Sequence, residues 1–157
     1  MIKKILVPLD GSKLAECALP YVEDIAAKMG VDEVVMVSVT ERIQGFMPIE
    51  DPSQPNGVYL RPEAVGKMER QAEKYLDRIA KGLEAKGIKV VKEVLLGNPA
   101  EEITIYAKNK GCDLIIMASH GRGGPSRWAH GSVADRVFRA ACTPVMMVRA
   151  PGCVAGV

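Results

Sequence analysis

A glycine-rich loop in the last third of the chain carries the residues best suited to chemistry. Residues 119–132, SHGRGGPSRWAHGS, follow an apolar run and combine four glycines with serine and histidine side chains. Glycine admits positive φ and lets a ligand approach the main chain closely. Three functions fit such a loop: a cradle for phosphate groups, a merely flexible turn, or a catalytic loop.

This loop matches neither of two common phosphate-binding motifs. A Walker A loop ends in Gly-Lys followed by Ser or Thr, and residues 119–132 contain no lysine. A dinucleotide fingerprint, GxGxxG, follows the first strand, whereas GRGGPS comes late and lacks the third glycine. Gly131-Ser132 begins a helix-like stretch whose free amides and dipole attract an anion. Alternatively, Ser132 and Asp135 form a capping pair for that helix.

Two further interpretations of charged and polar residues near the loop are disfavoured. His120 and Asp10, with either Ser119 or Ser126, suggest a hydrolytic triad, but the sequence has no G-x-S-x-G nucleophile motif. Arg136 and Arg139, on the helix after the loop, are interpreted as part of a solvated helix face rather than as phosphate ligands.

The elements that must position this loop alternate between apolar runs and helical patterns. Helical spacing of apolar residues occurs in 15–29, 62–87, from Asn98 onward, and in about 132–141. This alternation predicts one α/β sandwich with right-handed crossovers. The expected strands are 2–8, 31–40, 88–96, 113–119 and 144–150.

Several local signals refine these elements. Pro20 is expected to kink the first helix or delay its start. Asn98, Pro99 and Glu101 predict an N-cap, a first-turn proline and a capping box. Strand 88–96 alternates, which suits a position near the sheet edge. Segment 41–61 has no clear period, and predicts either a loop packed over the second strand or a lid or contact surface.

Composition restricts the class of protein. The 157 residues fit one domain, with 48% apolar residues, 25% charged residues and a net charge of +2. That charge is too small to imply nucleic acid or an acidic membrane as a partner. No run approaches 18 apolar residues, so a cytoplasmic protein is expected. Four cysteines without ligand spacing argue against a zinc site.

The loops that follow the first, second and fourth strands are the unusual ones. In an open parallel sheet, ligands bind beyond the carboxyl ends of the strands, where the strand order reverses. Residues 8–12, 41–61 and 119–132 are therefore expected along one edge of the sheet. This placement favours a ligand site over a merely flexible turn.

The same stretches resemble the universal stress protein family. MASH, then Gly121 followed nine residues later by Gly131-Ser132, resembles its nucleotide-binding signature, and ILVPLDGS and CTPVMMVR also resemble the family. The resemblance covers essentially the whole chain. Together with the alternation it predicts an open five-stranded parallel sheet, order 3-2-1-4-5, with helices on both faces in a Rossmann-like arrangement. One domain is expected over 1–150, followed by a short tail, 151–157.

The resemblance also implies an ATP site. ATP-binding members use G-x-x-G-x9-G-[ST], in which Gly121 and Gly131 match the second and third glycines, while Ala118 replaces the first. That replacement is expected to weaken binding about ten-fold without excluding it. The implied contacts are Pro8, Asp10, Val39, Met117, Ala118, Gly121, Gly131, Ser132 and Val133.

Each matched position has a physical role to play. Pro8, Val39 and Met117 can offer apolar surface to adenine, and the amides around Gly131 and its neighbours can hold phosphates. Asp10 can accept a hydrogen bond from ribose or hold a hydrated Mg²⁺. Alternatively, Asp10 belongs to a helix cap, because Asp and Ser both cap well.

These features predict an ATP-binding sensor or signalling module in stress response, which is not an enzyme or is at most a slow ATPase. One alternative is a stress protein that works by protein–protein contact without nucleotide; a less favoured one is an ATP-dependent hydrolase. A homodimer is expected through strand 144–149, because that apolar run ends the sheet and an exposed edge strand invites pairing.

Overall fold

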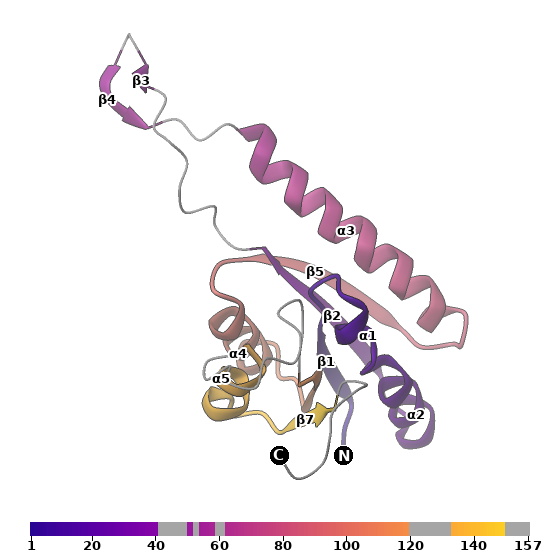
Figure 1. Ribbon diagram of the computed structural model, residues 1–157. Coiled ribbons are helices and arrows are strands. Elements are labelled where there is room, and N and C mark those ends of the chain that lie inside the picture. The colour runs from indigo at the N-terminus through magenta and orange to yellow at the C-terminus, as the bar shows by residue number, and fades with distance from the viewer. Residues whose placement is uncertain (41–49, 52–53, 59–61, 120–132, 150–157) are drawn as a thin grey trace.

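A computed structural model describes residues 1–40, 50–51, 54–58, 62–119 and 133–149, with side chains described for 1–40, 66–119 and 133–149. Five parallel strands form one sheet in the order β5-β2-β1-β6-β7 (Figure 1). When these five strands are numbered by their order along the chain, the order in the sheet is 3-2-1-4-5, so the predicted topology is confirmed. The strands are β1 (Lys4–Pro8), β2 (Glu33–Thr40), β5 (Val90–Leu96), β6 (Leu114–Ala118) and β7 (Val145–Val148).

Helices cover both faces of this sheet. One face carries α1 (Lys13–Glu16), α2 (Leu19–Met29) and α3 (Pro62–Glu84), and the other carries α4 (Pro99–Asn109) and α5 (Val133–Ala140). The expectation for Pro20 is confirmed, since α2 starts at Leu19 with the proline in its first turn, where no amide donor is needed.

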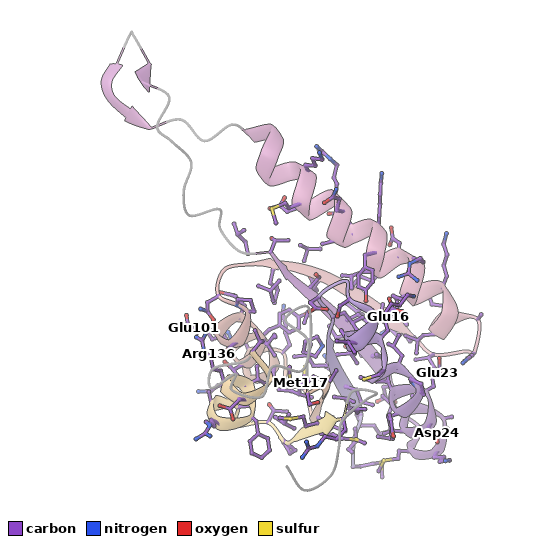
Figure 2. All side chains as sticks on the ribbon, viewed as in Figure 1. Glu16, Glu23, Asp24, Glu101, Met117 and Arg136 are labelled. Atoms are coloured by element: carbon purple, nitrogen blue, oxygen red, sulfur yellow. The ribbon has the colours of Figure 1, made fainter. Side chains whose placement is uncertain are left out.

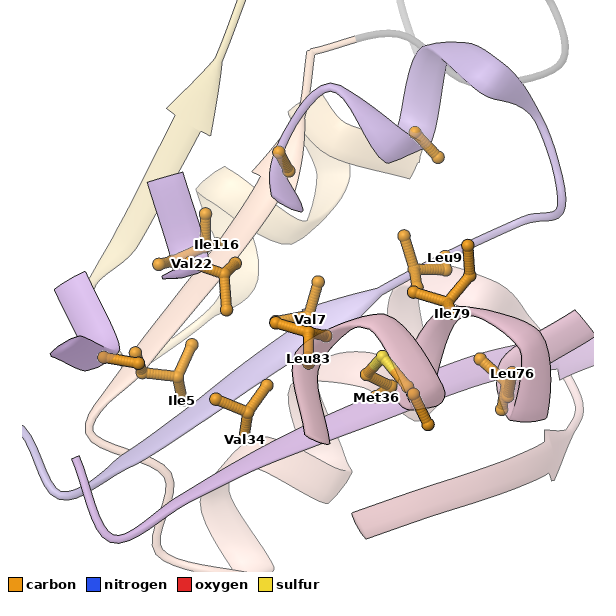
Figure 3. Packing of buried hydrophobic residues seen from close by; sticks show 14 of the residues in the cluster. Ile5, Val7, Leu9, Val22, Val34, Met36, Leu76, Ile79, Leu83 and Ile116 are labelled. Atoms are coloured by element: carbon orange, nitrogen blue, oxygen red, sulfur yellow. The ribbon is translucent and has the colours of Figure 1, made fainter. Parts of the chain in front are cut away.

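Two apolar clusters lie on the two faces of the sheet. The first, shown in Figure 3, contains Ile5, Val7 and Met36 of the sheet and Leu76 of α3. The second includes Ile115, which is fully buried. Burying each large aliphatic side chain stabilises the fold by roughly 1.5–3 kcal/mol. The central strands β1 and β6 are therefore firmly held and provide fixed starting points for the loops that follow them.

The structure departs from the sequence expectations in two places. The segment 41–61, expected to lack regular structure, contains an antiparallel pair, β3 (Glu50–Asp51) and β4 (Gln54–Val58). The prediction of a capping box at α4 was wrong. Asn98 does occupy the N-cap, with extended backbone, but its side chain makes no hydrogen bond to the helix. Within the described residues, no helix combines the length and apolarity needed to span a membrane.

Candidate functional site

The strand order reverses between β1 and β6, which pair in parallel through Ile5 with Leu114 and Leu6 with Ile115. From β1 the chain crosses to β2 on one side, whereas β6 is followed by β7 on the other. The edge formed by the carboxyl ends of the five strands, here called the carboxyl edge, is therefore where sheets of this topology bind ligands.

Three residues expected to contact adenine share one face of the sheet at the carboxyl edge. Met117 is 5% exposed and belongs to the second apolar cluster, against which Val39 packs. Leu6 lies in the same cluster, and side chains alternate along a strand, so Pro8 faces the same side. The sheet thus presents apolar surface from β1, β2 and β6 toward the layer of α4 and α5.

Helix α5 begins on that face. Its first residue, Val133, is 37% exposed, whereas Ala134 and Val137 are buried in the second cluster. A helix N-terminus carries unpaired amides and partial positive charge, which suit phosphate groups. Gly131 and Ser132, which directly precede this turn in sequence, lie outside the described residues, as do Gly121, His120 and the tail 151–157.

Ala118 is the last residue of β6 and pairs with Val148. None of the non-glycine residues that the structure describes has positive φ, so Ala118 has the ordinary backbone of a strand. An alanine in place of glycine weakens binding either where the backbone needs positive φ or where adenine lies against the α-carbon. The first of these causes does not apply to Ala118.

The loop after β1 is held by hydrogen bonds centred on Asp10. Its Oδ1 accepts from the Ser12 amide at 2.9 Å and from the Ser12 hydroxyl at 2.6 Å. Ser12 is the N-cap of α1, and its Oγ accepts from the Ala15 amide at 3.1 Å. Leu9, 3% exposed, donates its amide to the Val37 carbonyl at 2.8 Å. The cap expected in this loop is therefore formed by Ser12, which Asp10 orients.

The carboxylate of Glu16 binds α1 to α3. It lies 2.9 Å from Lys13 Nζ and 3.0 Å from Arg78 Nη2. Burial raises the pKa of Glu16, but the hydrogen bonds and positive charges of Lys13 and Arg78 together bring it below the ordinary value. Burial, with the charges of Glu16 and Asp10, raises the pKa of the Tyr75 hydroxyl. Tyr75 consequently stays neutral near the Asp10 loop at physiological pH.

Sequence reasoning missed a contact on the other side of the carboxyl edge. Arg136, interpreted as a solvated residue, donates from Nη2 to Asn98 Oδ1 at 3.1 Å and lies 3.8 Å from Glu101 Oε1. Figure 2 labels Arg136 and Glu101 on the α4–α5 side of the molecule. No spacing rule links residues 38 positions apart, so only the fold reveals this pair. Arg139 instead pairs with Asp135 inside α5, at 3.0 Å.

Metal ligands are sparse in the described part of the chain, where no group of three or more His, Cys, Asp or Glu side chains is placed to hold an ion. A Mg²⁺ ion bound with a nucleotide needs only one or two carboxylates, since phosphates and water complete its shell. The Asp10 carboxylate at the carboxyl edge fits that requirement.

Comparison with known proteins places these features in a family. The model of the universal stress protein family matches residues 1–149. Universal stress protein MJ0577 of Methanocaldococcus jannaschii is 30% identical over 159 residues, covering 95% of this chain and 96% of that protein. Its solved structure superposes with a TM-score of 0.78, covering 98% of this chain and 99% of that one.

Two other proteins extend the comparison. Universal stress protein MJ0531 of the same archaeon is 31% identical over 151 residues, covering 96% of this chain and 84% of that protein. A universal stress protein family structure from Arabidopsis thaliana, with AMP bound, shares the fold at 16% identity. Its TM-score is 0.64, over 96% of this chain and 93% of that one.

Proposed function

The chain belongs to the universal stress protein family, and on this premise we propose that it binds ATP at the carboxyl edge of its sheet. The bound nucleotide serves as the signal of a sensor or signalling module in stress response, in the cytoplasm. A homodimer through β7 belongs to the same proposal, because β7 ends the described sheet and exposes 37% of Met147.

The main support is that apolar surface and a helix N-terminus share one face of the sheet. Val39 and Met117 offer that surface to adenine, and α5 begins beside them at Val133. An aromatic base needs the first feature and a phosphate chain the second, so one nucleotide can satisfy both. The AMP-bound Arabidopsis protein, which has the same fold, holds the same adenine and ribose.

The remaining contacts follow the family's motif. Gly131 and Ser132 donate backbone amides to the phosphates, with Gly121 completing the cradle. Asp10 accepts from a ribose hydroxyl or holds a hydrated Mg²⁺. Three or four charge-assisted hydrogen bonds, reduced by the cost of association, correspond to a dissociation constant on the order of micromolar.

Hydrolysis of the bound ATP is slow, below about one turnover per minute. The proposed phosphate contacts are backbone amides and a serine hydroxyl, which bind phosphates without activating water. Asp10 accepts two hydrogen bonds from Ser12, at 2.9 and 2.6 Å, which fix its orientation. Phosphate release at several turnovers per second, abolished by Asp10→Ala, would make this residue catalytic.

Calorimetric titration with Mg-ATP tests the site. The unaltered protein is expected to bind with a micromolar dissociation constant, and Gly131→Val to abolish binding because a β-branched side chain blocks the amides. Gly82→Val is the matched control: Gly82 lies in the exposed part of α3, where an added Cβ meets nothing within 4 Å. It should retain the affinity of the unaltered protein.

A second candidate function is protein–protein contact without nucleotide, which the replacement of glycine by Ala118 favours. The two functions predict different titrations. No heat and no thermal shift at millimolar ATP would reject the nucleotide site and leave the contact function. Unchanged affinity in Gly131→Val would place the phosphates away from α5.

A further inference from the structure

The contact between Arg136 and Asn98 joins α5 to the turn that enters α4. Arg136 Nη2 donates to Asn98 Oδ1 at 3.1 Å, and the Arg136 side chain remains 44% exposed. The two helices also meet through buried apolar residues such as Ala134 and Ile103, and Arg136 lies 3.8 Å from Glu101 of α4. The hydrogen bond to Asn98 adds a directional link to this apolar packing and long ion pair.

Asn98 gives up a local hydrogen bond to make this link. At an N-cap, an asparagine side chain ordinarily accepts from an amide of the first helical turn, a contact that stabilises a helix by about 1 kcal/mol. Here Asn98 has N-cap backbone, with φ −78° and ψ 121°, and its carbonyl accepts from Glu102 at 2.9 Å. Its side chain nevertheless makes no cap bond and turns to Arg136 instead.

The turn that holds Asn98 is itself fixed to the end of β2. Gly97 donates its amide to the Thr40 carbonyl at 3.1 Å, and Thr40 Oγ1 donates to the Leu95 carbonyl at 3.3 Å. Gly97 has φ +150°, and a Cβ there would lie 2.6 Å from Glu102 Oε1. Thr40 directly follows Val39, so this chain of contacts begins beside the proposed adenine surface.

The chain of contacts ends at the first turn of α5, because Arg136 lies three residues after Val133. We propose that Arg136 is a positioning residue of the nucleotide site: through Asn98 it fixes the N-terminal turn of α5 relative to β2. The distance between the groups that hold the base and those that hold the phosphates is thereby set. This inference rests on the proposed ATP site.

The geometry distinguishes positioning from direct attraction of phosphate. The guanidinium of Arg136 already donates to Asn98 and lies 3.8 Å from the Glu101 carboxylate, which offsets its charge. If Arg136 acts through Asn98, removing either partner should have the same effect. If it acts by charge alone, removing Asn98 should not weaken phosphate binding.

The experiment compares Mg-ATP with adenosine by calorimetry for Arg136→Ala, Asn98→Ala and the double variant. Each single variant is expected to weaken Mg-ATP about ten-fold, the value of one hydrogen bond to a charged group, and adenosine less than about two-fold. The double variant should lose no more than either single variant, because both changes break the same link. Thermal unfolding of each variant confirms that it is folded.

Arg139→Ala is the matched control. It removes the same charge from the same helix, but Arg139 pairs with Asp135 within α5 and makes no contact outside it among the hydrogen bonds of the described residues. Its ratio of ATP to adenosine affinity should equal that of the unaltered protein.

Three outcomes would overturn the inference. Unchanged ATP affinity in Asn98→Ala would show that the link is not used, and equal losses for ATP and adenosine would show a general structural defect. A loss in Arg139→Ala as large as in Arg136→Ala would show an effect of charge alone. Each of these leaves ATP binding by the unaltered protein intact, whereas absence of that binding would overturn the proposed function together with this inference.

Discussion

The hydroxyl of Ser12 donates to Asp10 Oδ1 over 2.6 Å while its oxygen accepts the Ala15 amide at 3.1 Å, so one side chain both caps α1 and orients the carboxylate. Stability of a short helix and geometry of the proposed ribose contact are coupled in this residue. A change at Ser12 therefore tests both helix stability and the proposed ribose contact, although the family's motif assigns Ser12 no contact with nucleotide.

Replacing Ser12 with alanine should affect both properties. The lost cap is expected to lower the free energy of unfolding by about 1 kcal/mol, measured by urea denaturation. Asp10 keeps the Ser12 amide but loses the hydroxyl, so the dissociation constant for Mg-ATP should rise about three- to five-fold. Ser12→Thr retains the hydroxyl and should restore both values. Reduced stability with unchanged affinity would argue against Asp10 as a nucleotide ligand.

Ala118→Gly tests whether the departure from the glycine motif matters. Ala118 has strand backbone and is 7% exposed, so glycine gains no conformation that alanine is denied. Affinity for Mg-ATP should change less than about three-fold, while stability falls by about 0.5–1 kcal/mol because glycine is more flexible when unfolded. A ten-fold gain in affinity would show instead that the methyl group obstructs the adenine.

Much of the fold could be predicted from the sequence because its signals are local. The apolar runs that form β1, β2, β5, β6 and β7 alternate with segments of helical spacing. Alternating strands and helices pack as a parallel sheet with helices on its faces, so this pattern predicts the layers. The ends of strands shifted by one or two residues. For example, the run 2–8 became Lys4–Pro8, since pairing begins only where β2 lies alongside.

The site was less predictable because its contacts are long-range. The residues around Asn98 predict that its side chain caps α4. They give no sign that Arg136, 38 residues later, takes the Asn98 side-chain oxygen instead of the helix amides. Likewise, Asp10 and Ser12 were both plausible caps, and the roles were divided only by the hydrogen bonds. The β3–β4 pair was missed because QPNGV has the composition of a turn rather than of a strand.

Asp113 gives a pH-dependent prediction at the opposite edge of the sheet. Its Oδ2 accepts from the amides of Lys3 and Lys4 at 2.8 and 2.9 Å, and these hydrogen bonds lower its pKa below the ordinary 3.8. A lowered pKa in the folded state means that the stabilisation is present above pH 3.8 and is lost as pH falls through the folded-state value.

Asp113→Ala should therefore destabilise the protein by about 0.5–1 kcal/mol at pH 7, a value reduced by the exposure of the carboxylate. In urea titrations the difference should shrink as pH is lowered from 5 to about 2. Asp32→Ala removes only a surface ion pair with Lys3 and should cost less than about 0.5 kcal/mol. A difference for Asp113 that is constant over this pH range would contradict the assignment.

The proposed dimer has a test set by the hydrogen-bond register of β7. The carbonyl of Pro144 accepts from the amide of Ile115 in β6 at 2.9 Å, and that of Val148 accepts from the amide of Ser119, just after β6, at 2.7 Å. Polar groups of successive residues in a strand alternate in direction, so the amides of Val145 and Met147 face away from β6. These outward amides are the donors that a second copy of β7 would meet.

Met147→Pro should convert the dimer to a monomer while leaving the sheet intact. Proline removes an outward amide that pairs with nothing in β6, and an edge strand tolerates it. Met147→Ala removes most of the side chain but keeps the amide, and should remain dimeric. Light scattering at micromolar concentration should give twice the chain mass of 16.9 kDa for the unaltered protein and for Met147→Ala, and the chain mass for Met147→Pro.

Met146→Pro removes an amide directed at β6, so it should lower thermal stability as well. A dimer that survives Met147→Pro would exclude β7 pairing, and a monomeric unaltered protein would exclude the dimer itself.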